Sequence, residues 1–461
     1  MARRLAHNAF GHLVLCILFP SLLLMLASCA VGSPSQHQTL SSDPVVRWIQ
    51  QNASPLRTVA PGGSDTDLAP LQQMVGHASI VGLGEETHGT HEFIEVKARL
   101  AEYLITHLGF TTFVMENDWG ASQEIDAYIN GGSGSLTSVM HADLLVPWQT
   151  KEYAALFAWM RTYNANAAHT TKIHFWGMDI QDVSQSEFTT VERFVQQVAS
   201  QQSSVIQSLY APIIAKMLPN AYATYVPLDA ATKQQDQTQA QQVYDLLQTH
   251  QQSYTQTSSP QQFAFALQMA RIIVQCVTYF NTLAGIAPQQ SYQSYHQRDT
   301  FMAENVEWIH DHVAGVAPKM IVWAHDGHIA NDANYGSRDG RNMGAELRAT
   351  YQSGYLAIGT TTYQGAYRVY GAPSVMVKAI PQLTLSTYNY DLGQAGRPYY
   401  LLDLHKTPTS GAVADWVGGL SSANILPFYG VGGEDLSVSG ILNQWFDALV
   451  HVQISTPSQP L

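Results

Sequence analysis

The sequence predicts an α/β fold: a mainly parallel central sheet flanked by helices, with an inserted helical cap over the carboxyl edge of the sheet. Short apolar runs, of the kind that forms buried parallel strands, alternate with segments of helical period. One long segment, at about 185–296, contains no such run and is helical in period. We therefore expect one α/β domain over 44–461, with a helical insertion between two of its strands.

Six apolar runs are the expected strands, at residues 79–83, 111–115, 173–177, 320–324, 355–360 and 448–454. Side chains that can carry chemistry follow four of these runs directly. They are Glu85 and His88 after the first, Glu116 after the second, Asp179 after the third, and His325 and His328 after the fourth. Because the carboxyl ends of parallel strands meet at one edge of a sheet, we expect these groups to share that edge.

The first strand leads into the densest group of ionisable residues, GLGEETHGTHE at 82–92, and then into an amphipathic helix. His88 is the candidate general base, because the positive end of a helix dipole favours its neutral form. Glu85 and Glu116 are the candidates to orient His88 or a water molecule. The alternative is a structural role in which the polar residues of this turn cap the helix.

The remaining candidates each have an ordinary structural alternative. Glu116 is followed by residues that would equally serve as a helix N-cap, and Asp179 fits turn chemistry as well as support of a site. Arg298 would either clamp a substrate or form a salt bridge. His91, Trp148 and Asp179 are the candidate substrate contacts.

The pair His325 and His328 follows the fourth expected strand on a turn. Histidines three residues apart can both face a cleft and donate to a developing oxyanion. Together with the Glu85, His88 and Glu116 group, they also make a metal cluster chemically feasible. However, the spacing HGTHE at 88–92 is not a recognised zinc motif.

The N-terminal residues are expected to be removed rather than folded. Arg3 and Arg4 precede a short apolar stretch that ends in Leu-Ala-Ser-Cys29, which resembles a bacterial lipobox. We expect a lipoprotein signal peptide over 1–28, lipidation of Cys29 and a tether over 29–43, which anchor the protein outside the cytoplasm. The alternative is an ordinary signal peptide or membrane anchor. Cys276, in an apolar helical run, is expected to be a buried structural thiol.

Composition and missing motifs exclude several classes of protein. The net charge of −13 argues against nucleic acid and against charge-driven binding to anionic lipid, so only the N-terminal lipid would contact a membrane. The sequence contains no G-x-S-x-G elbow, no Walker A loop and no G-x-G-x-x-G. An ordinary serine hydrolase or nucleotide enzyme is therefore disfavoured, and the expected partner is a small molecule.

Several ordered motifs together resemble the erythromycin esterase family. They are GEETHG at 84–89, VME at 114–116, GMD at 177–179, RD at 298–299, WAHDGH at 323–328 and FDA at 446–448. The resemblance runs from about 65 to 457 and implies an α/β core with a helical cap. It also implies a metal-independent hydrolase in which the histidine matching His88 activates water to attack an ester, classically a macrolide lactone.

The same resemblance assigns further roles by position. Glu85 and Glu116 match the acidic site residues of the family, Arg298 matches its arginine, and His325 with His328 matches its second histidine pair. Two positions depart from the family pattern: Asp326 replaces a common Asn, and Glu86 replaces Ala or Pro. Both add negative charge beside the site, which favours raised carboxyl pKa values or cation binding. Some relatives are labelled as succinoglycan biosynthesis proteins.

The sequence therefore predicts an exported, lipid-anchored hydrolase of the erythromycin esterase type. It would cleave an ester or lactone, with macrolides as candidates, through water activated by His88, with no covalent intermediate and no cofactor. Two alternatives stay open: a metal-dependent hydrolase that uses the same cluster, and a non-catalytic surface lipoprotein that binds a ligand.

Overall fold

A nine-stranded sheet forms the centre of the fold in the computed structural model, which describes residues 40–283, 292–312, 318–332, 341–371 and 374–461. The expected signal peptide, Cys29 and residues 29–39 of the expected tether lie outside the described residues. Residues 41–461 form one compact unit.

Six strands of this sheet are parallel, and they are the six that the apolar runs predict. In spatial order they are β11 (Ala448–Ser455), β6 (Tyr355–Gly371), β2 (Ile80–Glu85), β5 (Met320–His325), β3 (Thr112–Asp118) and β4 (His174–Asp179). Every residue of β2, β3 and β5 is buried, as expected for strands covered on both faces. The predicted α/β fold with a mainly parallel sheet is confirmed.

Antiparallel strands complete the sheet at two places that the apolar runs did not indicate. Strand β8 (Tyr399–Asp403) pairs antiparallel with β11, and the short β1 (Ser54–Pro55) pairs with β8. Strand β7 (Ser374–Ala379) pairs antiparallel with the far half of β6. A separate two-stranded sheet joins β9 (Ile425–Leu426) to β10 (Val438–Ser439).

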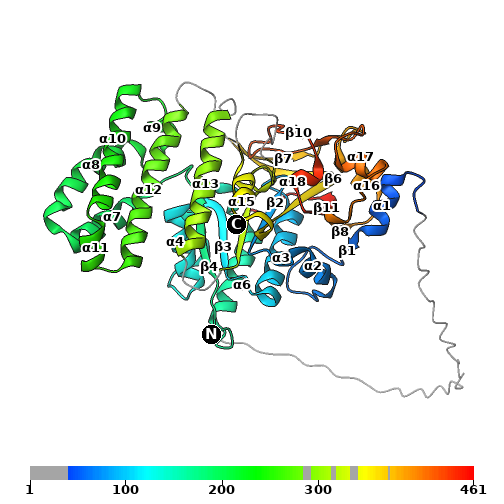
Figure 1. Ribbon diagram of the computed structural model, residues 1–461, viewed down its shortest axis with the longest axis horizontal. Coiled ribbons are helices and arrows are strands. Elements are labelled where there is room, and N and C mark those ends of the chain that lie inside the picture. Colours follow the sequence, from blue (N-terminus) through cyan, green and yellow to red (C-terminus); the bar gives the residue numbers. More distant parts are fainter. Residues whose placement is uncertain (1–39, 284–291, 313–317, 333–340, 372–373) are drawn as a thin grey trace, which may run out of the picture. The chain divides into compact units, whose positions relative to one another are not determined.

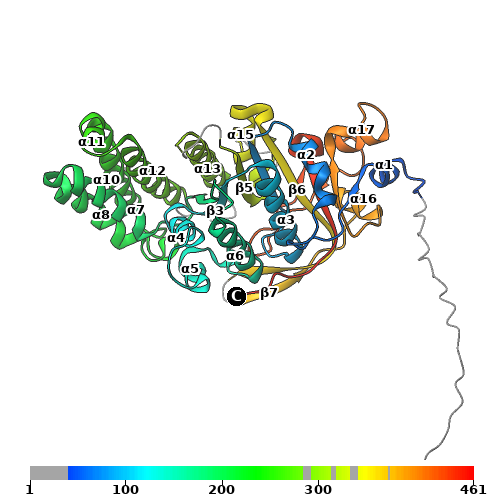
Figure 2. The ribbon, with the colours of Figure 1, turned by 90° about the horizontal axis from the view of Figure 1, so that it is seen from below.

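Helices cover both faces of the sheet because neighbouring strand residues point to opposite faces. Leu83 and Trp323 share one apolar cluster with helices α2 (Ala69–Val75), α3 (His91–Leu108) and α6 (Lys151–Ala165). Ile80 and Val322 join a second cluster with helices α13 (Tyr292–His312) and α15 (Met343–Tyr351). Figure 2 shows the sheet between these groups of helices.

The strand-free segment forms a group of helices, as its period predicted. They are α7 (Gln185–Val198), α8 (Ser203–Met217), α9 (Ala221–Thr224), α10 (Ala230–Thr249), α11 (Gln251–Thr257) and α12 (Pro260–Thr282). Both views show the group beside the β4 end of the sheet, next to α4 (Trp119–Ile129) (Figures 1 and 2). The helix that follows them, α13, packs on β4 and carries Arg298 to the carboxyl edge.

Helix α12 is the one described helix that is long and apolar enough to cross a membrane, yet 72% of its apolar window is buried inside the protein. That burial is typical of a core helix. Cys276 lies on α12, fully buried, and its thiol donates to the backbone oxygen of Asp182 over 3.4 Å. The expectation of a buried structural thiol is confirmed.

The other helices connect these elements. They are α1 (Pro44–Asn52), α5 (Leu136–Asp143), α14 (Asp326–Ile329), α16 (Tyr388–Gln394), α17 (Ala412–Val417) and α18 (Leu442–Trp445).

Candidate active site

Four neighbouring strands end in polar residues at the carboxyl edge of the sheet. Glu85 ends β2 and pairs in register with His325 at the end of β5. Glu116 lies near the end of β3, and Asp179 ends β4. Because β2, β5, β3 and β4 are adjacent and parallel, these side chains converge on one region.

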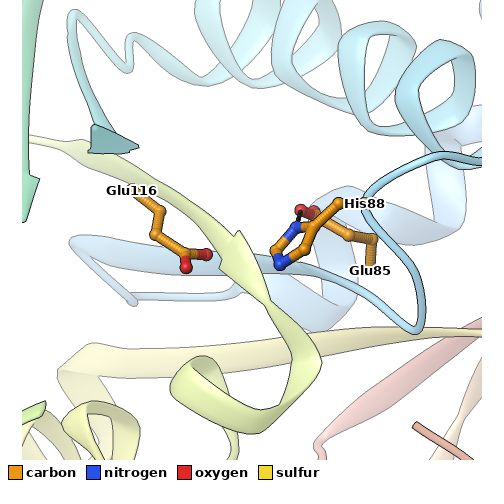
Figure 3. A group of neighbouring side chains, drawn as sticks. All are labelled: Glu85, His88 and Glu116. Atoms are coloured by element: carbon orange, nitrogen blue, oxygen red, sulfur yellow. Dashed lines mark hydrogen bonds and ion pairs between the residues drawn. The ribbon is translucent and has the colours of Figure 1, made fainter. Parts of the chain in front are cut away.

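His88 lies in the turn between β2 and α3, and its ring sits between Glu85 and Glu116 (Figure 3). His88 Nδ1 is 3.0 Å from Glu85 Oε1. A carboxylate can only accept, so Nδ1 carries the proton and Nε2 holds the lone pair. Within the described residues, Nε2 has no hydrogen-bond partner. Burial disfavours the imidazolium and lowers the pKa of His88 to about 4.

His88 is also the most accessible of the six predicted catalytic residues. Its side chain is 12% exposed, whereas Glu85, Glu116, Arg298, His325 and His328 are all buried.

Lys97 balances the charge of Glu85 inside the protein. Lys97 lies on α3, is buried, and forms an ion pair with Glu85 Oε2. Its ammonium also lies 4.0 Å from the centre of the Trp323 ring. Burial lowers the pKa of Lys97 well below its ordinary value. Lys97 thus fixes the carboxylate that orients His88.

Glu116 is the centre of a buried hydrogen-bond network. Its Oε1 accepts from Arg298 Nη2 over 2.6 Å, and its Oε2 accepts from the backbone N–H of His325 over 2.9 Å. Burial alone would raise its pKa, but the positive charges of His328 and Arg298 hold the pKa of Glu116 well below its usual range. Glu116 is therefore ionised at neutral pH.

Arg298 reaches this network from α13, and most of its donors are used within the protein. Its Nε and Nη2 form a two-point contact with Asp179, at 2.8 and 2.6 Å. Asp179 is completely buried and also accepts from Gln181 Nε2. The structure therefore places Arg298 and Asp179 in the frame that holds Glu116, rather than on an open substrate surface.

His328 lies on α14 and is held between two carboxylates. Its Nδ1 is 2.5 Å from Asp299 Oδ1, and its Nε2 is 3.3 Å from Glu116 Oε1 and 2.9 Å from Arg298 Nη1. Burial opposes the imidazolium, but the charges of Asp299 and Glu116 outweigh it and raise the pKa of His328 to about 9. His328 Nδ1 donates to Asp299, whereas Nε2 faces both Glu116 Oε1 and the Arg298 guanidinium, which can only donate.

His325 has a fixed tautomer. Its Nδ1 accepts from the backbone N–H of Gly327 over 3.1 Å, so the ring proton is on Nε2, which donates to the backbone oxygen of Glu86 over 3.2 Å. Burial lowers the pKa of His325 well below its usual value. With both nitrogens occupied, His325 has no free donor for an oxyanion in this arrangement, in contrast to the role inferred from the sequence.

Two of the expected substrate contacts are used in other ways. Trp148 is buried, its Nε1 donates to the backbone oxygen of Glu116 over 2.9 Å, and its ring meets the His88 ring edge-on at 4.9 Å. His91 forms an ion pair with Glu152 at 2.6 Å, which raises its pKa. His91 therefore points to α6 rather than joining the group around His88.

The two departures from the family pattern are buried behind the site. Asp326 accepts from the backbone N–H of Thr360, and Glu86 Oε2 accepts from the backbone N–H of Thr362 and from Asn389. Burial raises the pKa of each carboxyl well above its ordinary value. Both groups thus attach β6 to the turns that carry His88 and His325.

One nitrogen of His88 and one oxygen each of Glu85 and Glu116 lie within 4.8 Å of one another, a grouping that a metal ion could use (Figure 3). Two of these groups already have cationic partners: Lys97 neutralises Glu85, and Arg298 neutralises Glu116. A divalent ion would have to compete with both cations.

Solved structures share this fold over nearly its whole length. A crystal structure of a Bacillus cereus protein is 30% identical, covers 90% of this chain and 98% of its own, and has a TM-score of 0.79. A succinoglycan biosynthesis protein is 28% identical over the same shares, with a TM-score of 0.76. An erythromycin esterase mutant in its open conformation, 16% identical over 87% of this chain and 97% of its own, resembles it in fold, with a TM-score of 0.69.

The relatives in sequence support a hydrolase. The family model for erythromycin esterase matches residues 105–455, so the chain belongs to the erythromycin esterase family. The putative hydrolase YbfO of Bacillus subtilis (strain 168) is 22% identical over 79% of this chain and 80% of its own length. The erythromycin esterase type II of Escherichia coli is 24% identical over 69% and 77%.

Proposed function

We propose that this protein hydrolyses an ester or lactone bond with water that His88 activates. One observation carries the proposal: the Glu85 carboxylate fixes the His88 proton on Nδ1 and leaves Nε2 as an unoccupied acceptor in the most accessible part of the site. This is the arrangement that a histidine general base needs.

The reaction needs one water molecule and no group from outside the chain. His88 Nε2 takes a proton from water as the water oxygen attacks the carbonyl carbon. The imidazolium then returns that proton to the alkoxide as the ester C–O bond breaks, which yields a carboxylic acid and an alcohol. Glu85 at Nδ1 stabilises the imidazolium while it exists.

We infer that Glu116 orients the attacking water. It is ionised and lies within 4.8 Å of His88 through their polar atoms, a span that one hydrogen-bonded water bridges. Arg298, His328 and Asp179 act by holding Glu116 in position and in its charged form. His325 acts by holding the Glu86 carbonyl, and Trp148 acts through its contact with the His88 ring.

A substrate panel tests the proposal. Purified protein is incubated with macrolide lactones, 4-nitrophenyl acetate and other simple esters in ¹⁸O-labelled water, and products are read by mass. We expect addition of water to at least one substrate, with one labelled oxygen in the acid product and no acylated protein under turnover. An intact protein that turns over none of them supports ligand binding instead.

The second candidate is a metal-dependent hydrolase, which the close grouping of Glu85, His88 and Glu116 favours. Metal analysis of the purified protein and chelator treatment separate the two. Stoichiometric zinc, manganese or iron, whose removal abolishes turnover and whose return restores it, would support this candidate.

We also propose that the protein is exported and anchored to the membrane through lipid on Cys29. The support is the signal-like residues 1–28 and their Leu-Ala-Ser-Cys ending. Expression in a bacterial host with radiolabelled palmitate should label the wild type in the membrane fraction and leave Cys29→Ser unlabelled. Equal labelling of both proteins would contradict lipidation at Cys29.

A further inference from the structure

The last six residues of the sequence, Thr456–Leu461, run along the turn that carries His88. The backbone N–H of Ser458 donates to the backbone oxygen of Gly89 over 2.9 Å, and the backbone N–H of His91 donates to Thr456 over 2.8 Å. Thr90 and Pro457 also form an antiparallel bridge. We call residues 456–461 the strap.

Two charged side chains attach the strap to the rest of the protein. Glu92, buried in the first turn of α3, accepts from both the backbone N–H and the hydroxyl of Thr456, each over 2.6 Å. Arg368, on β6, donates through Nε to the backbone oxygen of Ser458 over 2.8 Å. Arg368 also donates its backbone N–H to Gly89 over 2.9 Å, so the residue after His88 is bonded from two sides.

The far half of the strap is attached to the segment that carries Trp148. The backbone N–H of Gln459 donates to the Glu152 carboxylate over 3.0 Å, and the backbone N–H of Leu461 donates to Gln149 over 3.1 Å. Trp148 is the residue whose ring meets His88 edge-on and whose indole donates to the Glu116 backbone. The strap thus connects Gly89, the residue after His88, to Gln149, the residue after Trp148.

We propose that the strap sets the position of His88 between Glu85 and Glu116, and that Glu92 and Arg368 are positioning residues for the hydrolytic reaction. Neither residue touches the water or the ester in this scheme. Their effect passes through Gly89, His91 and the strap to the His88 ring. The effect on catalysis rests on the proposed function, whereas the effect on the position of His88 does not. The test therefore includes the titration of His88, which needs no substrate turnover.

The test compares Glu92→Gln, Arg368→Met and their double variant with a matched control, Glu95→Gln. Glu95 lies on the same helix and makes no hydrogen bond to the strap within the described residues. Gln at 92 keeps the size of the side chain but removes its charge and one of the two oxygens that accept from Thr456, so the two charge-assisted hydrogen bonds cannot both persist. Met at 368 keeps the length of the side chain but has no donor.

Two measurements are made on each protein. Kinetics on the best ester of the panel should show a fall in kcat of roughly 10-fold or more in the double variant, with KM nearly unchanged, because a small misplacement of the base slows chemistry. NMR titration of His88 should show its pKa moving from about 4 toward the ordinary 6.5 as the loosened turn admits water. The control should match the wild type in both.

The two readouts separate the two proposals. An unchanged His88 pKa in folded variants would overturn the positioning role of the strap. A rise in KM with an unchanged kcat would overturn it as well. A shifted titration in a protein that hydrolyses no ester overturns the proposed function and leaves the positioning role standing. If the double variant does not fold, each single variant is judged by the same criteria, since each retains one attachment.

Discussion

At the scale of single residues, the site depends on opposite pKa shifts in two histidines. His88 has an oriented lone pair and a low pKa because it is buried, whereas His328 has a high pKa because two carboxylates outweigh the effect of burial. The pair thus supplies a neutral base and a positive charge at the same pH. This division of roles is what an acid–base site requires at neutral pH.

The pH dependence of kcat/KM should therefore have two limits. Below about pH 4 His88 is protonated and cannot accept from water, so activity should fall as the pH drops through about 4. Above about pH 9 His328 loses the positive charge that, together with Arg298, stabilises the Glu116 carboxylate, so activity should fall again. A profile measured with the best ester of the panel checks both limits. An acidic limit near 6.5 would show that His88 is not desolvated or is not the base.

Lys97 offers a second test at this scale. Lys97→Met should destabilise the protein by about 3–5 kcal/mol, because it leaves the buried Glu85 charge without its partner. Glu85→Gln combined with Lys97→Met removes both charges and should recover part of that loss. Urea unfolding of the wild type, both single variants and the double variant measures the coupling. Additive effects would contradict a direct ion pair.

At the scale of elements, the turn between β2 and α3 is held by close backbone packing. A Cβ at Gly89 would lie 1.9 Å from the backbone oxygen of Arg368, and neither chain segment can move without breaking the hydrogen bonds between them. The β6 strand therefore forms one wall of the turn. This explains a glycine next to the base on grounds of space rather than dihedral freedom.

Gly89→Ala should lower both stability and activity. Forcing a methyl group against backbone costs about 1–3 kcal/mol and should displace His88 from Glu85. Thermal unfolding and kcat on the same ester measure the two effects. Gly63→Ala is the control, since nothing lies within 4 Å of a Cβ there. Wild-type turnover in Gly89→Ala would argue against a tightly constrained turn.

At the scale of the whole molecule, the sequence predicted the features that depend on local pattern. The six parallel strands follow from runs such as MIVWA before His325, because a strand buried on both faces must be apolar throughout. The polar residues that follow these runs lie close together because the strands are neighbours in the sheet and parallel. The helical insertion followed in the same way from its period.

Other features depend on which elements pack together, and no local pattern carries that information. The attachment of Lys97 to Glu85 and of Asp299 to His328 requires the approach of α3 to β2 and of α13 to α14. Most of the strap contacts join residues more than 300 positions apart, such as Glu92 and Thr456. His91 appeared to belong to the site because of its sequence neighbours, yet its helix directs it toward Glu152.

The account depends most on His88 as the base that activates water. The direct measurement is kcat/KM of His88→Gln against the wild type on the best ester of the panel, with thermal unfolding of both proteins. We predict a loss of at least about 10³-fold, since general base catalysis contributes typically 10²–10⁴-fold and the oriented water is lost with it. The unfolding temperature should stay close to that of the wild type. A folded His88→Gln protein that keeps wild-type kcat/KM would contradict the account.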